Sequence, residues 1–117
     1  MSGGYTLPKT ALLRKSAQYN AVYRRGKRIR GRHFSLIFLS NDQGYNRLGI
    51  SVHGVKTAVR RNRFKRVVRE FFRLNRDLLP QDVDMVFAIR KECTLDSPQA
   101  VLDAVSSLLA HHDEGKK

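Results

Sequence analysis

The stretch Lys56–Arg73 reads KTAVRRNRFKRVVREFFR and carries eight Lys or Arg, one acid and a regular series of apolar residues. At 100° per residue the apolar side chains share one arc of a helix, which we expect to span residues 57–79 and to end at Pro80. The apolar arc contains Phe64, Val67, Val68, Phe71, Leu74 and Leu78, and the opposite side contains Asn62, Lys65, Arg66, Arg69, Arg73 and Arg76. The stretch therefore predicts a helix that packs on a core and presents positive charge to an anionic partner.

The charge of the whole chain points to a nucleic acid as that partner. The 117 residues carry 23 Lys or Arg and 10 Asp or Glu, a formal net charge of +13. Residues 1–76 hold nineteen of the cations and two of the acids, a net charge of +17, whereas residues 77–117 have a net charge of −4. Since so much self-repulsion is tolerated when a polyanion supplies counter-charge, we expect the first two thirds of the chain to form the binding surface.

Hydrophobic periodicity predicts one helix before this stretch and one after it. The first spans residues 16–25, with Ser16 as its N-cap and Gly26 at its end, and the last starts at Ser97 and Pro98. Strands are expected at 33–40, 47–53 and 84–90, with residues 26–32 as a basic loop or a short edge strand.

These elements predict a single α+β domain over residues 1–117, a two-layer α/β sandwich in the order α-β-β-β-α-β-α. Residues 1–9 and 111–117 are expected to be flexible tails. Alternation along the strands predicts one apolar sheet face, which the helices cover, and one small, polar or basic face that stays open. An open sheet face beside a basic helix would form a groove.

The sequence contains no pattern for catalysis or metal binding by its own side chains. His33, His53, His111 and His112 lack the spacing of metal ligands, and Cys93 has no second thiol beside it. There is no nucleophile elbow, paired-carboxylate arrangement or Walker loop. We therefore expect neither a catalytic residue nor a metal ligand in this chain.

The single cysteine also excludes an intramolecular disulfide, and this indicates a reducing cytoplasm. No apolar run approaches the length of about 18 residues that a membrane span needs, and the N-terminus lacks the apolar segment of a secretory signal. A basic amphipathic helix can lie on an anionic membrane, but that role calls for exposed Trp or Leu anchors. We expect a soluble, cytoplasmic protein that binds no membrane.

Two basic clusters are candidates for phosphate contacts. One consists of Arg24, Arg25, Lys27, Arg28, Arg30 and Arg32, and the other of the eight cations in Lys56–Arg73. If about six to eight of them meet phosphates, the logarithm of the affinity should fall with the logarithm of the salt concentration at a slope of roughly −4 to −7. Arg60 and Arg61 lie toward the apolar side of the helix in its first turn, where we expect them to overhang the core and to reach the edge of the groove.

Tyr19 and Tyr23 lie on one face of the first predicted helix. Two interpretations remain open for them, because a tyrosine ring can pack in the core or line a groove in which unpaired bases stack.

The segment Ala58-Val59, followed by Arg61-Asn62-Arg63 and Phe64-Lys65-Arg66, resembles the signature of the protein subunit of bacterial ribonuclease P. The pattern Tyr19-x-x-x-Tyr23-x-x-Gly26-x-Arg28 is similar to that family's aromatic pair and glycine. Arg32-His33-Phe34 and the run from Arg47 to Val52 resemble its strands. The resemblance covers most of the chain, and Arg-Asn-Arg is specific only within this longer context.

The resemblance implies a fold with an unusual left-handed βαβ crossover and a role beside a catalytic RNA. In that family the RNA removes the 5′ leader from precursor tRNA with Mg²⁺, and the protein assists it. The implied partners are thus the catalytic RNA and the precursor leader, with no protein partner and no cofactor held by protein side chains. The implied contacts to the catalytic RNA are Lys56, Arg60, Arg61, Asn62, Arg63, Lys65, Arg66 and Arg69. The implied leader cleft contains Tyr19, Tyr23, Phe34, Ile37 and Ala58.

One segment departs from the family pattern. The family usually has a lysine pair just after the second strand, whereas this chain has His53 and Gly54, and the link to Ala58 is one residue shorter. Lys56 is the candidate to supply the missing charge. The alternatives to the whole interpretation are a ribosomal or general RNA-binding protein, and a DNA-binding protein with its basic helix in the major groove.

Overall fold

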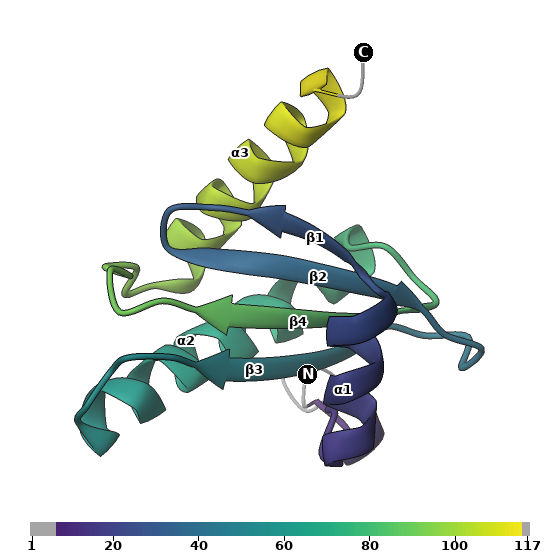
Figure 1. Ribbon diagram of the computed structural model, residues 1–117, viewed down its shortest axis with the longest axis horizontal. Helices are drawn as coiled ribbons and strands as arrows, with labels where there is room; N and C mark the ends of the chain where they lie inside the picture. The colour runs from purple at the N-terminus through teal and green to yellow at the C-terminus, as the bar shows by residue number, and fades with distance from the viewer. Residues whose placement is uncertain (1–6, 116–117) are drawn as a thin grey trace.

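A four-stranded sheet lies at the centre of the computed structural model, which describes the backbone of residues 7–115 and the side chains of residues 7–110. One helix covers part of the front face of the sheet in Figure 1, and two helices cover the back. The strand order is β1-β2-β4-β3. The strands are β1 Lys27–Arg30, β2 Phe34–Ser40, β3 Arg47–Val52 and β4 Val83–Ile89.

The helices are α1 Ser16–Arg25, α2 Ala58–Asn75 and α3 Pro98–Gly115, with short 3₁₀ turns η2 at Lys9–Ala11 and η3 at Arg76–Leu78. The predicted order of the elements is therefore confirmed. Residues 1–6 and 116–117, which belong to the predicted tails, lie outside the described part of the chain. Within the described part, Lys9 belongs to a helical turn and the backbone of α3 continues to Gly115.

The strands β3 and β4 are parallel neighbours joined by α2, and the other neighbouring strands pair antiparallel. In Figure 1 both parallel strands run to the left, β4 lies above β3, and α2 returns to the right behind the sheet. This is a left-handed crossover, the rare hand for a βαβ unit. The left-handed βαβ crossover that the resemblance implied is therefore present.

The larger core lies between the back of the sheet and the helices α2 and α3. The ring of Phe87 in β4 lies 5.0 Å from that of Phe34 and 5.9 Å from that of Phe71, between centroids. Leu74 and Leu78, which we expected in this core, are 54% and 80% exposed, whereas Phe72 is fully buried. Phe72 and Leu74 mark the two edges of the apolar arc, and the sheet covers the Phe72 edge. Leu78 lies beyond the end of α2, where the tighter η3 turn breaks the helical register.

A smaller core lies on the front of the sheet beneath α1. Its buried members are Leu13, Val22, Ile37, Val86 and Ala88, with Tyr19 and Tyr23 packed against them. The front face is therefore not fully open as we expected, because α1 covers its middle. The part of this face beyond α1 stays polar and basic.

Local capping decides where the helices begin. The Thr57 hydroxyl accepts the backbone N–H of Arg60 at the start of α2, and the Ser97 hydroxyl accepts that of Ala100 at the start of α3. The cap that we expected from Ser16 is wrong. The Gln18 side chain caps α1 instead, because its carbonyl oxygen accepts the backbone N–H groups that precede the helix.

Candidate nucleic-acid interface

Tyr19 is half-buried and fixed to the edge of the sheet. Its hydroxyl accepts the backbone N–H of Ile50 at 3.1 Å, and it lies 3.4 Å from the carbonyl oxygen of Leu13. The ring lies against the backbone of Gly49, where a Cβ atom would come within 2.8 Å of a ring carbon. The ring packs against the smaller core while one side of it stays exposed, so core packing is confirmed in part and the stacking role stays a prediction.

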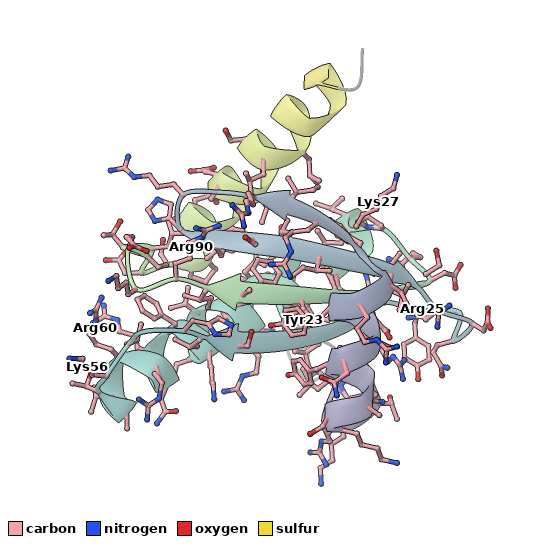
Figure 2. All side chains as sticks on the ribbon, viewed as in Figure 1. Tyr23, Arg25, Lys27, Lys56, Arg60 and Arg90 are labelled. Carbon is pink, nitrogen blue, oxygen red and sulfur yellow. The ribbon has the colours of Figure 1, made fainter. Side chains whose placement is uncertain are left out.

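Tyr23 begins a chain of hydrogen bonds across the open part of the face. Its hydroxyl is hydrogen-bonded to the Ser51 hydroxyl, which is also hydrogen-bonded to Nε2 of His53 at 3.1 Å. The guanidinium of Arg28 lies 5.7 Å from the centre of the Tyr23 ring, within the range of a cation–π contact. Figure 2 shows Tyr23 at the side of α1 that faces the sheet. We call the surface around Tyr19, Tyr23, Ser51 and His53 the tyrosine cleft.

Two residues that we expected in this cleft do not line it. Phe34 is 2% exposed and lies in the core behind the sheet, because its position in β2 points away from α1. Ile37 has the correct orientation, but α1 covers it completely. Ala58 is exposed in the first turn of α2. The expectation for Phe34 and Ile37 as exposed contacts is therefore wrong.

The outer face of α2 carries the predicted basic surface. Asn62, Arg63, Arg66 and Arg69 are exposed, and Lys65 is half-buried. A shallow hollow of about 470 Å³ runs along this face and is lined by Asn62, Arg66, Arg69, Glu70 and Arg73, with Leu7 beside them. Arg73 pairs with Glu70 and lowers the pKa of that carboxyl through their hydrogen bond.

Arg60 and Arg61 are adjacent in the first turn of α2 but make different contacts. The Arg60 guanidinium lies 5.4 Å from the centre of the Phe64 ring, so it overhangs the core as we expected. The Arg61 guanidinium instead turns back and donates to the carbonyl oxygens of Val55 and Lys56, at 3.0 and 3.1 Å. Arg61 therefore holds the short loop between β3 and α2, and Lys56 is exposed on that loop.

The tyrosine cleft and the basic face of α2 meet at the outer edge of β3. A hollow of about 260 Å³ there is lined by Tyr19 from α1, by Ile50 from β3, and by Lys65 and Arg69 from α2, with Leu12, Leu13 and Leu48 at its base. Residues far apart in the sequence thus border one depression. Aromatic and cationic groups together match the requirements of single-stranded RNA, whose bases stack while its phosphates need counter-charge.

The basic cluster at residues 24–32 does not form one surface. Arg28 and Arg30 point to the front of the sheet, because they pair with Ile37 and Ser35 of β2. Lys27 pairs with Phe38 and points to the back, where it lines a hollow with Arg25. Arg25 and Lys27 lie at the opposite end of the molecule from Lys56 and Arg60 in Figure 2. Arg24 and Arg32 are also exposed.

Two further arginines hold the fold together, a role that the sequence alone did not reveal. Arg47 forms two hydrogen bonds with the buried carboxylate of Asp84, at 2.7 and 2.8 Å, which raise the pKa of the guanidinium. Arg76 donates to the side-chain and backbone oxygens of the fully buried Asn46, at 2.7 and 3.0 Å. These arginines pair within the protein, so they count toward the net charge but not toward the interface.

Within residues 7–110, no three His, Cys, Asp or Glu side chains gather as a metal site would require. The described helices include none with the length and apolar character to cross a membrane.

Comparison with known proteins assigns this arrangement to a family. A family model described as Ribonuclease P matches residues 7–113. The ribonuclease P protein component of Desulfotalea psychrophila is 53% identical over 105 residues, which cover 89% of this chain and 88% of that protein. The corresponding protein of Pelotomaculum thermopropionicum is 39% identical over 84% of this chain and 88% of its own length.

The solved structures agree with the sequence comparisons. The ribonuclease P protein from Thermotoga maritima superposes with a TM-score of 0.73 at 33% identity, covering 83% of this chain and 93% of that one. The matched region of the family model includes every element that borders the tyrosine cleft and the basic face of α2. The chain therefore belongs to the ribonuclease P protein family, whose members are components of a tRNA-processing ribonucleoprotein.

Proposed function

We propose that this chain binds the catalytic RNA of ribonuclease P through the basic face of α2 and the 5′ leader of precursor tRNA through the tyrosine cleft. Cleavage itself is carried out by the RNA with its Mg²⁺ ions. The protein supplies affinity for the leader and lowers the Mg²⁺ concentration that the reaction needs. It acts without a protein partner.

The observation that carries this proposal is the shared edge between the two surfaces. Tyr19 and Lys65 line one hollow, although they come from helices on opposite faces of the sheet. A protein with this geometry can contact two RNA segments at once and hold them side by side. General RNA binding requires positive charge, but it does not require an aromatic cleft to meet a basic helix at the edge of one strand.

The effect on Mg²⁺ follows from electrostatics. A leader and a catalytic RNA repel one another, and this repulsion must be reduced before the precursor can bind in the cleavage geometry. Cations fixed on α2 reduce this repulsion. Fewer Mg²⁺ ions must then bind from solution for the same fraction of precursor to be bound. The protein should change the affinity for the precursor more than the rate of cleavage in the bound complex.

The test measures cleavage and binding with precursor and mature tRNA, each with and without the protein, over a series of Mg²⁺ concentrations. We expect the protein to restore cleavage at low Mg²⁺ and to strengthen binding of the precursor but not of mature tRNA. A protein effect that is the same for mature and precursor tRNA would contradict the leader assignment. An unchanged requirement for the protein in single-turnover cleavage at saturating Mg²⁺ would contradict the division between affinity and rate.

Salt dependence tests the contact with the catalytic RNA separately. The cations counted on this side are Lys56, Arg60, Arg63, Lys65, Arg66 and Arg69. Arg61 is left out because it holds two loop carbonyls, and Arg73 because it pairs with Glu70, whereas Arg69 makes one long bond of 3.4 Å to the carbonyl oxygen of Lys65. Six phosphate contacts on helical RNA correspond to a slope of about −5 for log affinity against log salt. A slope near −1 would show that α2 does not carry the interface.

A further inference from the structure

A hollow of about 500 Å³ lies behind β1 and β2, on the back of the sheet. The two strands contribute Ile29 and Phe38, the segment that leads into β4 contributes Pro80 and Val83, and α3 contributes Leu109. In Figure 1 α3 passes behind β1 and continues beyond the sheet, so the helix does not lie flat along the back of these strands. The volume is within the range of about 300–1,000 Å³ for small-molecule sites, which are mostly apolar.

The hollow combines an apolar surface with positive charge. Arg25 and Lys27 are exposed, and they are the only charged side chains among the described residues that line it. Lys27 is the cross-strand partner of Phe38, so its side chain starts directly beside the apolar surface. Neither cation forms an ion pair with a described carboxylate. Two unpaired cations beside apolar side chains favour a ligand that has both an anionic and an apolar part.

We propose that this hollow binds a straight-chain carboxylate, the chemical class of a free fatty acid. Arg25 and Lys27 hold the carboxylate, and the alkyl chain covers the apolar residues between the sheet and the end of α3. The inference goes beyond the proposed function and does not depend on it. In Figure 2 Arg25 and Lys27 lie at the opposite end of the molecule from Lys56 and Arg60, and Lys27 points away from the face that carries the tyrosine cleft.

The two parts of the ligand contribute differently to its affinity. Phe38, Val83 and Leu109 are half-buried, so an alkyl chain that covers them removes apolar surface from water on both sides of the contact. Each CH₂ group that is fully buried should strengthen binding about three- to fourfold. The carboxylate meets cations that are exposed to solvent, so each of them should contribute only about threefold. The chain therefore supplies most of the affinity, and the cations fix its direction.

The experiment follows the amide NMR signals of the full chain during titration with acetate, octanoate, decanoate and 1-decanol, each below its micellar concentration. The proteins are the wild type, Lys27→Ala, Ser40→Phe and Arg30→Ala. Ser40 is exposed, lines the hollow and points to the same face as Phe38, so the new ring fills the hollow without displacing a buried side chain. Arg30 is the matched control, since it is an exposed cation on the same strand as Lys27 that points to the front. Sedimentation velocity of each protein reports self-association.

We expect decanoate to shift the signals of Val83 and Leu109 in a saturable way, with equal affinity for the wild type and Arg30→Ala. Octanoate should bind about tenfold more weakly than decanoate, and acetate should not saturate these signals. Lys27→Ala should weaken decanoate binding about threefold, and Ser40→Phe more than tenfold.

The inference is overturned if decanoate gives no saturable shift at these residues, or if it binds all four proteins equally. Binding of 1-decanol as tight as that of decanoate would overturn the role of the cations. Self-association of the wild type that Ser40→Phe abolishes would show that a second copy of the chain covers the hollow, and this too would overturn the inference. RNA affinity enters none of these measurements, so their outcome is independent of the proposed function.

Discussion

The two arginines of the Arg61-Asn62-Arg63 segment should respond differently to truncation, although the family resemblance assigns both to RNA. Arg61 is half-buried and donates to two backbone carbonyls of the preceding loop. Arg63 is exposed, and no described residue accepts a hydrogen bond from it. We therefore expect Arg61→Ala to act on the fold and Arg63→Ala to act on RNA binding.

The structure sets the size of each effect. Hydrogen bonds from a charged donor contribute about 1.5–3 kcal/mol each when buried, and the partly exposed loop carbonyls place the pair at a total of roughly 1–2 kcal/mol. For a chain of this size that corresponds to a fall in Tm of about 3–10 °C. Arg63→Ala should change the free energy of unfolding by less than about 0.5 kcal/mol and reduce the salt slope for catalytic-RNA binding by about 1.

Thermal unfolding followed by circular dichroism, together with RNA affinity at several salt concentrations, separates the two effects. Arg61→Lys is the control for charge, because it keeps the cation on a side chain one bond shorter than the one that brings Nη1 to both carbonyls. Like Arg61→Ala, it should keep the wild-type salt slope and unfold at a lower temperature than the wild-type protein. The reasoning is refuted if Arg61→Ala unfolds at the wild-type temperature and lowers the salt slope as much as Arg63→Ala does.

Three other expectations concern single side chains. Tyr19→Phe should lower stability by about 0.5–1.5 kcal/mol in urea unfolding, because the edge N–H of Ile50 loses its acceptor while the ring remains for stacking; wild-type stability would show that water replaces the hydroxyl. Asp84→Ala should cost about 3–5 kcal/mol, since the Arg47 guanidinium loses its carboxylate, and a loss below 1 kcal/mol would contradict this pairing. Burial raises the pKa of the Cys93 thiol, so less thiolate is present at neutral pH and alkylation by iodoacetamide should be slow in the native protein and fast after unfolding. Equal rates in both states would place this thiol at the surface.

The fold could be predicted from the sequence where periodicity and capping agree. The apolar spacing of Phe64, Val68 and Phe71 defines the buried side of α2, and Ser97 begins α3 as expected. The alternation in β3 and β4 assigns their side chains to the correct faces. These signals are local, and each follows from the geometry of one helix or one strand.

The features that the sequence did not predict depend on contacts between residues far apart in the chain. The sequence marks Phe34 as an aromatic residue at the start of a strand, but only the position of α1 decides which face is the cleft, and Phe34 points to the other one. The roles of Arg47 and Arg76 were hidden for the same reason, because their partners Asp84 and Asn46 lie 37 and 30 residues away in the sequence. Charge counting treats every arginine alike, and only tertiary structure separates the paired ones from the free ones.

The resemblance to the family implied a lysine pair after β3, and this chain has His53 and Gly54 there instead. The backbone N–H of His53 donates to the carbonyl oxygen of Ile89, so the loop without the lysines begins directly beside Arg90. Attraction for a phosphate depends on the distance to a cation and on the local dielectric, not on the strand that carries the cation. Arg30 and Arg90 carry positive charge at this end of the sheet whether or not the loop contains lysines. The loop can be short, with Gly54 at a positive φ of 78° and with its carbonyls held by Arg61. The loop that departs from the implied pattern is thus bonded to β4 next to Arg90 and closed by Arg61, so positive charge is present at this end of the sheet without a lysine pair in the loop.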